Sequence, residues 1–392
     1  MPLIIQKYGG KSLATPEDVR QVAELILRRV ESGEQVVVVV SAMGDTTDRY
    51  VRMARAVNPE PAGRELDVLL SVGERISIAM LALALNGLKK DIAVSLTGAQ
   101  AGIITDTVHT AARIVEIRPL RVREVLDQGR IPVIAGYQGI TTDKNISTLG
   151  RGGTDATAVG LAVALGADRV EFMKDVDGIH SADPKLIPTA KIIDKLSFEE
   201  ALEMMGCGAK ILQAPAVEMA AEHGVTLAVG NSKTGVAGTI VTDKPLVRQT
   251  LTSVHVTEQV DCLTGLQPDA FYRLLDTIRD CGLSPLMSFH HENTCAVTLR
   301  PGEARYLSAN SCEVDRSLDL VTLIGPGVTS NNDLARAIRA LYTEFKSSIV
   351  AMTATSTRIS LLMKDRHAKS FAEKAHELCL RSPKTGGALP PT

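Results

Sequence analysis

The stretch LIIQKYGGKSLATPED, residues 3–18, sets the fold class of the chain. An apolar run, Leu3–Tyr8, ends in two glycines, and Thr15 then precedes a proline and two acidic residues. Threonine is a good N-cap, proline suits the first turn of a helix, and acidic side chains favour the positive end of the helix dipole. The pattern predicts a strand, a glycine turn and a helix, the repeating unit of a parallel α/β sheet.

The same alternation of short β-rich runs and longer helical patterns continues to about Asp243. Several runs are uninterrupted apolar segments, as expected for parallel strands covered by helices on both faces. Another helix is predicted from about Arg64 to Leu85, because apolar residues recur there every three or four positions. The predicted strands are Leu3–Tyr8, Val36–Val40, Ile92–Leu96, Ile131–Ala135, Arg169–Met173 and Val225–Val229.

The pattern changes around Lys244–Gln249, and we place the end of the first domain, residues 1–245, there. Two βαββ-like passages of about 65 residues follow, and they predict two small α+β modules over 250–315 and 316–382. The first module begins with a strand predicted over Val254–Leu263. The last residues, 383–392, hold three prolines and two glycines and are predicted to be disordered.

The amino-acid composition limits the classes of partner that the protein is expected to bind. The 392 residues include 43 Lys and Arg against 45 Asp and Glu, and this net charge of −2 excludes a polyanion-binding surface spread over the whole protein. Aromatic residues make up 3%, without Trp, which removes most stacking platforms for single-stranded nucleic acid. Uncharged apolar stretches are shorter than a membrane span, and the first strand leaves no room for a signal peptide. We therefore expect no nucleic-acid and no membrane partner.

The spacing of the cysteines indicates whether the protein belongs to a reducing or an oxidising compartment. Six cysteines are scattered along the chain without CxxC spacing. This distribution is typical of reduced thiols in a cytoplasmic protein and predicts no zinc or other bound-metal site.

The first glycine pair is a candidate phosphate site. The segment KYGGKS, residues 7–12, places two lysines and two glycines at the end of a strand. Backbone N–H groups of glycines can approach phosphate oxygens, and a lysine at a strand end can neutralise a transferring phosphoryl group. The Walker A pattern GxxxxGK[ST] is absent from the sequence, so a plain βα loop is the alternative at this point.

Residues 147–157, STLGRGGTDAT, form a second glycine-rich turn ahead of a helix of small residues. The free N–H groups and the dipole at the start of a helix favour an anion. The guanidinium group of Arg151 can donate two parallel hydrogen bonds to a carboxylate. Asp155 lies in the first predicted turn, where it can cap the helix or organise a lysine or a metal ion.

A third segment, KDVDGIHSADPK at residues 174–185, directly follows the predicted strand Arg169–Met173. Ligands of α/β sheets bind at the carboxyl ends of strands, so its three acids and two lysines suit a nucleotide or Mg²⁺. A solvated loop with Asp-Gly and Asp-Pro turns is the alternative. Two further segments, VSAMGDTTD (40–48) and RELDVLLSVGE (64–74), offer hydroxyls for a substrate carboxylate and an acid for an ammonium group.

In this order, the segments resemble the aspartate kinases of the amino acid kinase family. The resemblance runs from Gln6 to about Thr239, and the region after it looks like the pair of ACT modules that aspartate kinases carry. It implies a three-layer αβα sandwich with a mainly parallel sheet, followed by two ferredoxin-like α+β ACT modules. The matching segments are KYGGKS, VSAMGDTTD, RELDVLLSVGE, SLTGAQAGI, AGYQGI, STLGRGGTDATA, KDVDGIHSADP and GAKIL.

The resemblance also implies a reaction, in which ATP with Mg²⁺ phosphorylates the side-chain carboxylate of L-aspartate to 4-phospho-L-aspartate, the first step of the aspartate-family amino-acid pathway. Lys7 would stabilise the transferring phosphoryl group, and Asp155 would organise that lysine. The family further implies a homodimer or higher homo-oligomer, and an amino-acid effector at the ACT-like modules. By motif position, aspartate would be held by Ser41, Thr47, Glu74 (on its ammonium group) and Arg151, and ATP by Lys7, Gly9, Gly10, Ser12, Lys174, Asp175, His180, Lys185 and Lys210.

Several positions depart from the family pattern. Lys11 stands where a hydroxyl is expected, and Asp45 is acidic where lysine is common. Lys174 and His180 replace threonine and tyrosine in the nucleotide segment. These changes leave two alternatives open. One is a related kinase of the same fold that acts on another carboxylate or on a nucleotide, such as N-acetylglutamate or UMP. The other is a catalytically weak regulatory subunit that binds amino acids through its C-terminal modules.

Overall fold

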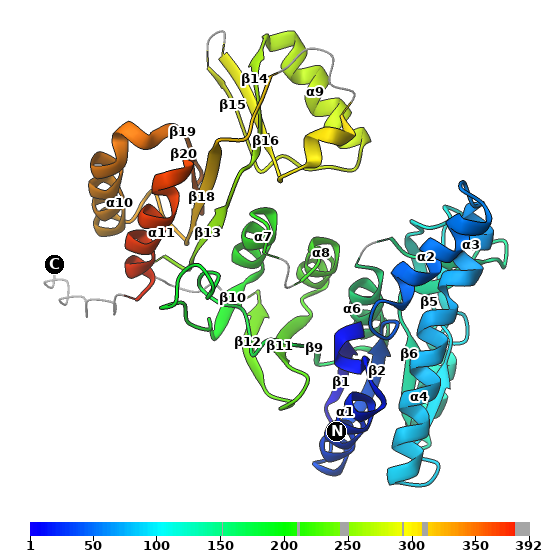
Figure 1. Ribbon diagram of the computed structural model, residues 1–392. Coiled ribbons are helices and arrows are strands. Elements are labelled where there is room, and N and C mark those ends of the chain that lie inside the picture. The colour runs from blue at the N-terminus through cyan, green and yellow to red at the C-terminus, as the bar shows by residue number, and fades with distance from the viewer. Residues whose placement is uncertain (151, 210–211, 244–250, 292–293, 308–312, 381–392) are drawn as a thin grey trace, which may run out of the picture. The chain divides into compact units, whose positions relative to one another are not determined.

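The computed structural model describes residues 1–150, 152–209, 212–243, 251–291, 294–307 and 313–380 (Figure 1). The chain divides into two compact units. The first unit comprises Met1–Ile179, Asp194–Phe198 and Leu212–Lys244, and the second comprises His180–Ile193, Glu199–Ile211 and Pro245–Thr392. The expected first domain, 1–245, therefore differs from the first unit by two segments. One of them, 180–193, contributes Ala182 and Ile187 to the hydrophobic core of the second unit.

An eight-stranded sheet forms the centre of the first unit. Its neighbouring strands are parallel except for the antiparallel pair β11 and β12. Each strand predicted before Asp243 is present. Leu3–Tyr8 and Ile131–Ala135 have the predicted bounds, and the ends of the other strands are shifted by at most two residues. In spatial order the strands are β10 (Lys195–Ser197), β12 (Ala237–Thr242), β11 (Thr226–Asn231), β9 (Arg169–Lys174), β1 (Leu3–Tyr8), β2 (Gln35–Val40), β6 (Ile131–Ala135) and β3 (Ala93–Leu96).

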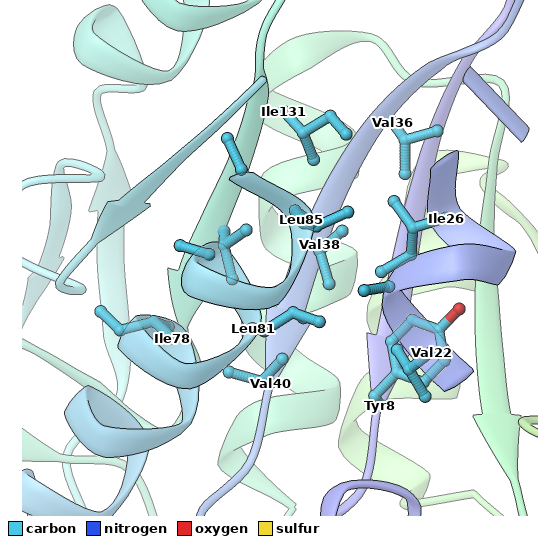
Figure 2. Packing of buried hydrophobic residues seen from close by; sticks show 14 of the residues in the cluster. Tyr8, Val22, Ile26, Val36, Val38, Val40, Ile78, Leu81, Leu85 and Ile131 are labelled. Atoms are coloured by element: carbon cyan, nitrogen blue, oxygen red, sulfur yellow. The ribbon is translucent and has the colours of Figure 1, made fainter. Parts of the chain in front are cut away.

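One face of this sheet is covered by α1 (Pro16–Glu31) and α4 (Val72–Leu88) (Figure 2). Helix α1 begins as predicted after Thr15, whose Oγ1 accepts a hydrogen bond from the N–H of Asp18 at 3.2 Å. Figure 2 shows Ile26 of α1 and Leu81 of α4 packed with Val38 of β2 in one hydrophobic cluster. These side chains form the core on this side of the sheet.

Helix α6 (Gly153–Leu165) packs on strands β1, β2 and β9 from the opposite face. Alternate strand residues point to opposite faces, so Val39 lies on the face away from Val38. A Cβ atom built on Gly136 would lie 3.0 Å from Val39 Cγ1 and 2.4 Å from Thr154 Cγ2, so α6 begins against the carboxyl ends of β2 and β6. Helix α8 (Ala214–His223) packs beside α6. The layers are those of the expected αβα sandwich.

The helix predicted over Arg64–Leu85 is two helices, α3 (Gly63–Leu70) and α4. The helix is interrupted at Ser71, whose carbonyl oxygen accepts a hydrogen bond from Gln138 Nε2 at 2.9 Å. A Cβ atom on Gly73 would lie 2.7 Å from Ala42 Cβ, which shows how closely this turn packs. Together, Gly63–Leu88 is long and apolar enough to cross a membrane, but half of its most apolar window is buried within the protein, as in a core helix.

The first unit also contains a four-stranded sheet beside the main one. Its spatial order is β5 (Ile114–Ile117), β4 (Ile103–Thr105), β7 (Gln138–Thr141) and β8 (Ile146–Thr148). The remaining elements of the unit are η1 (Gly10–Leu13), α2 (Thr46–Val57) and α5 (Leu120–Asp127).

The second unit contains two four-stranded antiparallel sheets. One has the order β13 (Ser253–Thr257), β18 (Leu318–Ile324), β20 (Arg358–Lys364) and β19 (Ile349–Ala354), and it packs with α10 (Asn332–Phe345) and α11 (Asp365–Leu380). The other has the order β15 (Met287–His291), β16 (Thr294–Leu299), β14 (Asp261–Leu266) and β17 (Glu313–Asp315), with α9 (Pro268–Asp280). Helix α7 (Phe198–Gly206) lies almost entirely within the second unit as well.

The strand predicted over Val254–Leu263 is in fact two strands, β13 and β14, which belong to different sheets. Gln259 between them has a left-handed φ of 50°, and its N–H donates to Asp319 Oδ1 at 2.8 Å. The chain turns there because this side-chain acceptor stabilises the bend. The module of β14 to β17 is therefore inserted between β13 and β18 of the other module, whereas the sequence pattern predicted two consecutive modules, 250–315 and 316–382. The tail predicted to be disordered, 383–392, lies outside the described residues.

Candidate active site

The loops that follow β1, β2 and β6 are joined by backbone hydrogen bonds at the carboxyl edge of the main sheet. The N–H of Ser41 donates to the carbonyl of Tyr8 at 3.1 Å, and the N–H of Gly136 donates to the carbonyl of Val40 at 3.0 Å. The N–H of Gly44 donates to the carbonyl of Gly10 at 3.0 Å. This edge is where ligands of open α/β sheets bind.

Gly10 allows the first two of these loops to touch. A Cβ atom at this position would lie 2.4 Å from the carbonyl oxygen of Ala42, a distance that no side chain can occupy. Gly9 precedes it in extended conformation, and a Cβ atom there would be 3.9 Å from Lys7 Nζ. The glycine pair therefore brings backbone N–H groups close to the lysine at the end of β1, as a phosphate cradle requires.

Lys7 and Asp155 form a shielded ion pair. Lys7 Nζ lies 2.8 Å from Asp155 Oδ1, and their side chains are 10% and 5% exposed. Lys174, at the end of β9, is close enough for their charges to affect it. Burial lowers its pKa, Asp155 opposes that shift and Lys7 adds to it. The structure thus brings together three of the predicted residues, two cations and one carboxylate.

Helix α6 begins at this cluster after a left-handed glycine. Gly152 has φ of 81°, and a Cβ atom on it would lie 2.6 Å from Gln213 Cγ. A Cβ atom on Gly153 would lie 2.4 Å from Leu149 Cβ. Both glycines are therefore required by the turn, which directs the positive end of the α6 dipole at the site. Arg151, predicted to bind a carboxylate, lies outside the described residues.

Glu74 is buried in the first turn of α4 with one oxygen that lacks a partner. Its Oε1 accepts a hydrogen bond from the N–H of Ala42 at 3.0 Å, whereas Oε2 is buried without a hydrogen-bond partner among the described residues. Burial raises the pKa of Glu74 to about 7, although the bond from Ala42 acts in the opposite direction. A buried carboxylate oxygen of this kind is suited to a cationic ligand.

Two hydroxyl groups accompany Glu74 in the predicted substrate set. Ser41 Oγ donates to Thr154 Oγ1 at 3.2 Å, which links the loop after β2 to the first turn of α6. Thr47 is the second residue of α2 and is half-buried. The structure therefore connects Ser41 to the cluster around Asp155 through a hydrogen bond, and Glu74 to the same loop through Ala42.

The nucleotide segment is divided between the units. Lys11 Nζ lies 3.1 Å from Asp175 Oδ2, with both side chains exposed, and this hydrogen bond lowers the pKa of Asp175. Ser12 is buried, with Oγ donating to the carbonyl of Met173 at 3.4 Å. His180 and Lys185 belong to the second unit. The remaining predicted ATP-binding residue, Lys210, lies outside the described residues.

The sequence did not single out Asp67 and Tyr137. Asp67 is fully buried in α3, where its carboxylate accepts the N–H of Thr110 at 3.0 Å and the hydroxyl of Thr148. Tyr137 has φ of 64° and a pKa raised by burial, and its hydroxyl is hydrogen-bonded to Thr148. A Cβ atom on Gly153 would lie 3.1 Å from the Tyr137 ring. The one sequence signal for Asp67 was the position of this acidic residue within the apolar helical pattern of RELDVLL.

A resident metal ion has no ready ligand set here. Among the described residues, there is no group of three or more His, Cys, Asp or Glu side chains placed to hold a metal ion. Mg²⁺ commonly keeps several waters and binds through one or two carboxylates and substrate phosphates. The exposed carboxylate of Asp175 at the end of β9 fits that mode of binding.

Comparisons with known proteins agree with this geometry. The model of the amino acid kinase family matches residues 2–231. The aspartokinase of Mycolicibacterium smegmatis is 39% identical over 404 aligned residues, which cover 96% of each chain. Crystal structures of E. coli aspartokinase III cover 97% of this chain and 100% of their own. The complex with aspartate and ADP (R-state) has a TM-score of 0.77 at 23% identity, and the complex with lysine and aspartate (T-state) has 0.80 at 22% identity.

The likeness to the E. coli structures is one of fold, whereas the likeness to the mycobacterial sequence extends along nearly the whole chain. Together with the strand-end cluster of Lys7, Asp155 and Lys174, these findings lead to one assignment. The chain belongs to the amino acid kinase family and, within it, to the aspartokinases.

Proposed function

We propose that the protein transfers the γ-phosphoryl group of ATP to the side-chain carboxylate of L-aspartate, giving 4-phospho-L-aspartate and ADP. The observation that carries the proposal is the buried Oε2 of Glu74, which has no hydrogen-bond partner among the described residues. It belongs to a carboxylate bonded to the loop that also carries Ser41. An amino-acid substrate supplies the ammonium group that this oxygen lacks. N-Acetylglutamate and UMP have no free ammonium group, so Glu74 favours aspartate over both alternatives.

The transfer needs charge neutralisation more than covalent chemistry. A carboxylate oxygen of aspartate attacks the γ-phosphorus, the bond to the β,γ-bridging oxygen breaks, and its electron pair leaves with ADP. Lys7 would neutralise the equatorial oxygens, and Asp155 holds the Lys7 ammonium group in one place. The N–H groups of Gly9 and Gly10 would bind phosphate oxygens. A lysine held by an ion pair needs little reorganisation at the moment of reaction.

The substrate and nucleotide would bind on opposite sides of Lys7. Glu74 would accept hydrogen bonds from the ammonium group of aspartate, Ser41 and Thr47 would contact its carboxylates, and Arg151 would pair with one of them. Lys174 and Asp175 would face the phosphates and the Mg²⁺ ion that accompanies ATP. The other residues proposed to bind ATP by family likeness are Ser12, His180, Lys185 and Lys210.

We further propose that the second unit regulates the enzyme. Its two α+β modules are of the ACT type that the family carries, and the T-state structure of E. coli aspartokinase III contains lysine. An amino acid bound to these modules would act as effector, and the modules would join chains into a homodimer or larger assembly. A cytoplasmic location suits a biosynthetic enzyme whose six cysteines are scattered along the chain without CxxC spacing.

The proposal is tested by incubating the full chain with ATP and Mg²⁺ in hydroxylamine, which converts an acyl phosphate to a coloured hydroxamate. L-Aspartate is expected to give hydroxamate, and N-acetyl-L-aspartate, which lacks the ammonium group, is expected to give none. Hydroxamate from N-acetylglutamate, or conversion of UMP to UDP, without product from aspartate would favour the related kinases. Amino-acid binding without any turnover would favour the regulatory subunit.

A further inference from the structure

Asp67 is a fully buried carboxylate that joins three segments of the first unit. It lies in α3, and its Oδ2 is 2.6 Å from Nδ1 of His109, in the loop between β4 and β5. Its Oδ1 accepts the N–H of Thr110 at 3.0 Å and the hydroxyl of Thr148, at the end of β8. An ionised carboxylate only accepts hydrogen bonds, so the bonded nitrogen of His109 carries its proton. These bonds offset the cost of burying the charge, and each ties α3 to another segment.

Thr148 extends this network towards the turn that begins α6. Its hydroxyl proton is directed at Asp67, so its oxygen is left to accept the hydroxyl of Tyr137. Tyr137 is held a second time, because its carbonyl accepts the N–H of Leu149 at 2.8 Å. A Cβ atom on Gly153 would lie 3.1 Å from the Tyr137 ring, so the ring packs against the first residue of α6. The network thus runs from α3 to the start of α6.

The other end of the network lies beside Glu74. Asp67 and Glu74 are on the consecutive helices α3 and α4, separated by the turn at Ser71. The carbonyl of Ser71 accepts Gln138 Nε2 at 2.9 Å, from the residue that follows Tyr137. Burial raises the pKa of Tyr137, and the nearby charges of Glu74 and Asp67 add to that shift. Glu74 is therefore close enough to the network for its charge to act on it.

We propose that Asp67 is a positioning residue that sets the spacing between the two groups that hold the ends of the substrate. Through Thr148 it fixes α3, and with it α4 and Glu74, against the start of α6. Glu74 would bind the ammonium group, whereas Ser41, whose Oγ donates to Thr154 of α6 at 3.2 Å, would bind a carboxylate. The inference rests on the proposed function, since it takes Glu74 and Ser41 as substrate-binding residues.

L-Glutamate is the probe of this spacing, because it is one methylene group longer than L-aspartate. In a site of fixed shape, one methylene group changes kcat/KM by about 10–200-fold. If α3 is no longer tied to β8, the site binds aspartate less well and excludes glutamate less strictly. A purely structural role for Asp67 would instead reduce the amount of folded enzyme and leave the ratio of the two kcat/KM values unchanged.

The test measures kcat, the KM for ATP and the KM for the amino acid in variants of the full chain. Thr148→Val removes the hydroxyl between Asp67 and Tyr137 and keeps the shape of the side chain. It is expected to raise the KM for aspartate about fivefold and to lower the preference for aspartate over glutamate by about the same factor. The kcat and the KM for ATP should stay within twofold of wild type, because Lys7 and Lys174 belong to other strands, β1 and β9. Thr148→Ser keeps the hydroxyl and should restore wild-type values.

Asp67 itself is tested by two substitutions. Asp67→Asn keeps an oxygen that accepts from Thr110 and Thr148. Its amide can donate to Nδ1 of His109 in the other tautomer, so the KM for aspartate should stay within twofold of wild type. Asp67→Leu removes all these bonds and is expected to match or exceed the effect of Thr148→Val. If Asp67→Leu does not fold, Thr148→Val and Thr148→Ser carry the test.

Thr105→Val is the matched control for Thr148→Val. Thr105 is another fully buried threonine of the small sheet, and its Oγ1 lies 2.8 Å from the carbonyl of Asp106 and 2.7 Å from Ser147 Oγ. Its loss leaves the bonds of Asp67 in place, so the KM for aspartate should not change. An unchanged KM for aspartate in Thr148→Val, an equal rise in the KM for ATP, or the same change in Thr105→Val would overturn the inference.

Hydrogen–deuterium exchange of the protein without ligands distinguishes this inference from the proposed function. If the wild type makes no hydroxamate from aspartate, the proposed function fails, but exchange can still be measured in every variant. Faster exchange at the start of α6, residues 153–159, in Thr148→Val and not in Thr105→Val supports the role of Asp67. Identical exchange in both variants and the wild type contradicts it, whatever the substrate of the enzyme.

Discussion

Lys7 Nζ and Asp155 Oδ1 lie 2.8 Å apart, although their residues are separated by most of the first unit of the chain. Lys7 is the next-to-last residue of β1 and Asp155 lies in the first turn of α6, so the parallel sheet and the helix packed on it bring them together. Both side chains are largely shielded from water, where a charge acts more strongly on a transferring phosphoryl group.

Lys7→Ala is expected to reduce kcat by about 10²–10³-fold, because a preorganised positive group at the transferring phosphoryl is lost. Asp155 would then lose its ion-pair partner and keep only the nearby charge of Lys174, so the free energy of unfolding should fall by up to about 3–5 kcal/mol. In the double variant Lys7→Met with Asp155→Asn, stability should return but activity should not. Steady-state kinetics and thermal melting check this, and a near-normal kcat for Lys7→Ala would refute the role assigned to the lysine.

The affinity for aspartate should depend on pH through Glu74, whose pKa is about 7 in the absence of ligand. Below that pH the carboxyl is protonated and cannot pair with an ammonium group, so kcat/KM for aspartate should rise as pH increases towards 7 and then level off. Glu74→Gln should raise the KM for aspartate about tenfold or more, because a hydrogen bond between charged groups is lost, and it should remove this pH step. A pH profile that is the same in both proteins would contradict the assignment.

Glu74 should also affect stability, with a sign that follows from its raised pKa. The folded protein holds the Glu74 proton more tightly than the unfolded chain, whose pKa is 4.5, so stability due to this group falls as pH rises from 4.5 through about 7. Glu74→Gln keeps an acceptor for the N–H of Ala42 and removes the buried charge. Its melting temperature should therefore exceed that of wild type by more at pH 8 than at pH 5.

Gly10→Ala should cost both activity and stability. The new Cβ atom would lie 2.4 Å from the carbonyl of Ala42, so the loops after β1 and β2 must separate, at a cost of about 1–3 kcal/mol. Gly87→Ala is the matched control, because it has open space around it within α4 and should stabilise the protein by about 0.5–1 kcal/mol. Denaturant unfolding and kinetics distinguish them. A Gly10→Ala enzyme with normal kcat would show that the loop contact is not needed.

Lys11→Thr should change nucleotide binding and leave stability nearly unchanged. The Lys11 and Asp175 side chains are 82% and 59% exposed, and exposed ion pairs contribute about 0–1 kcal/mol. Lys11 nevertheless adds positive charge beside the proposed phosphate site, so its loss should raise the KM for ATP at low ionic strength. The difference from wild type should shrink in about 1 M salt, where the Debye length is about 3 Å. A salt-independent difference would indicate a structural role instead.

The features that the sequence predicted correctly are those that depend on residues close to one another in the chain. The apolar strands and the N-cap at Thr15 depend on neighbouring residues, and the Lys7 and Asp155 positions follow from where a strand ends and a helix begins. The break at Ser71 was not predictable, because Gln138, which bonds its carbonyl, lies 67 residues away. The insertion of one module into the other was missed for a related reason, since it depends on β13 pairing with β18 across the intervening module.

The nucleotide segment is another feature that the sequence predicted only in part. Its acids and lysines marked 174–185 as a ligand segment, but nothing in KDVDGIHSADPK indicates that it belongs to two units. Asp67 is similar, because its partners Thr110 and Thr148 come from distant segments.

The most direct test of the central claim is the fate of the aspartate oxygens. L-Aspartate labelled with ¹⁸O in its side-chain carboxylate is incubated with enzyme, ATP and Mg²⁺, and hydroxylamine then attacks the carbonyl carbon of the product and releases phosphate with the bridging oxygen. Each phosphate released with hydroxamate is expected to carry one ¹⁸O atom by mass spectrometry, and Lys7→Ala is expected to yield little of this labelled phosphate. Unlabelled phosphate, without hydroxamate, would mean that water rather than aspartate receives the phosphoryl group.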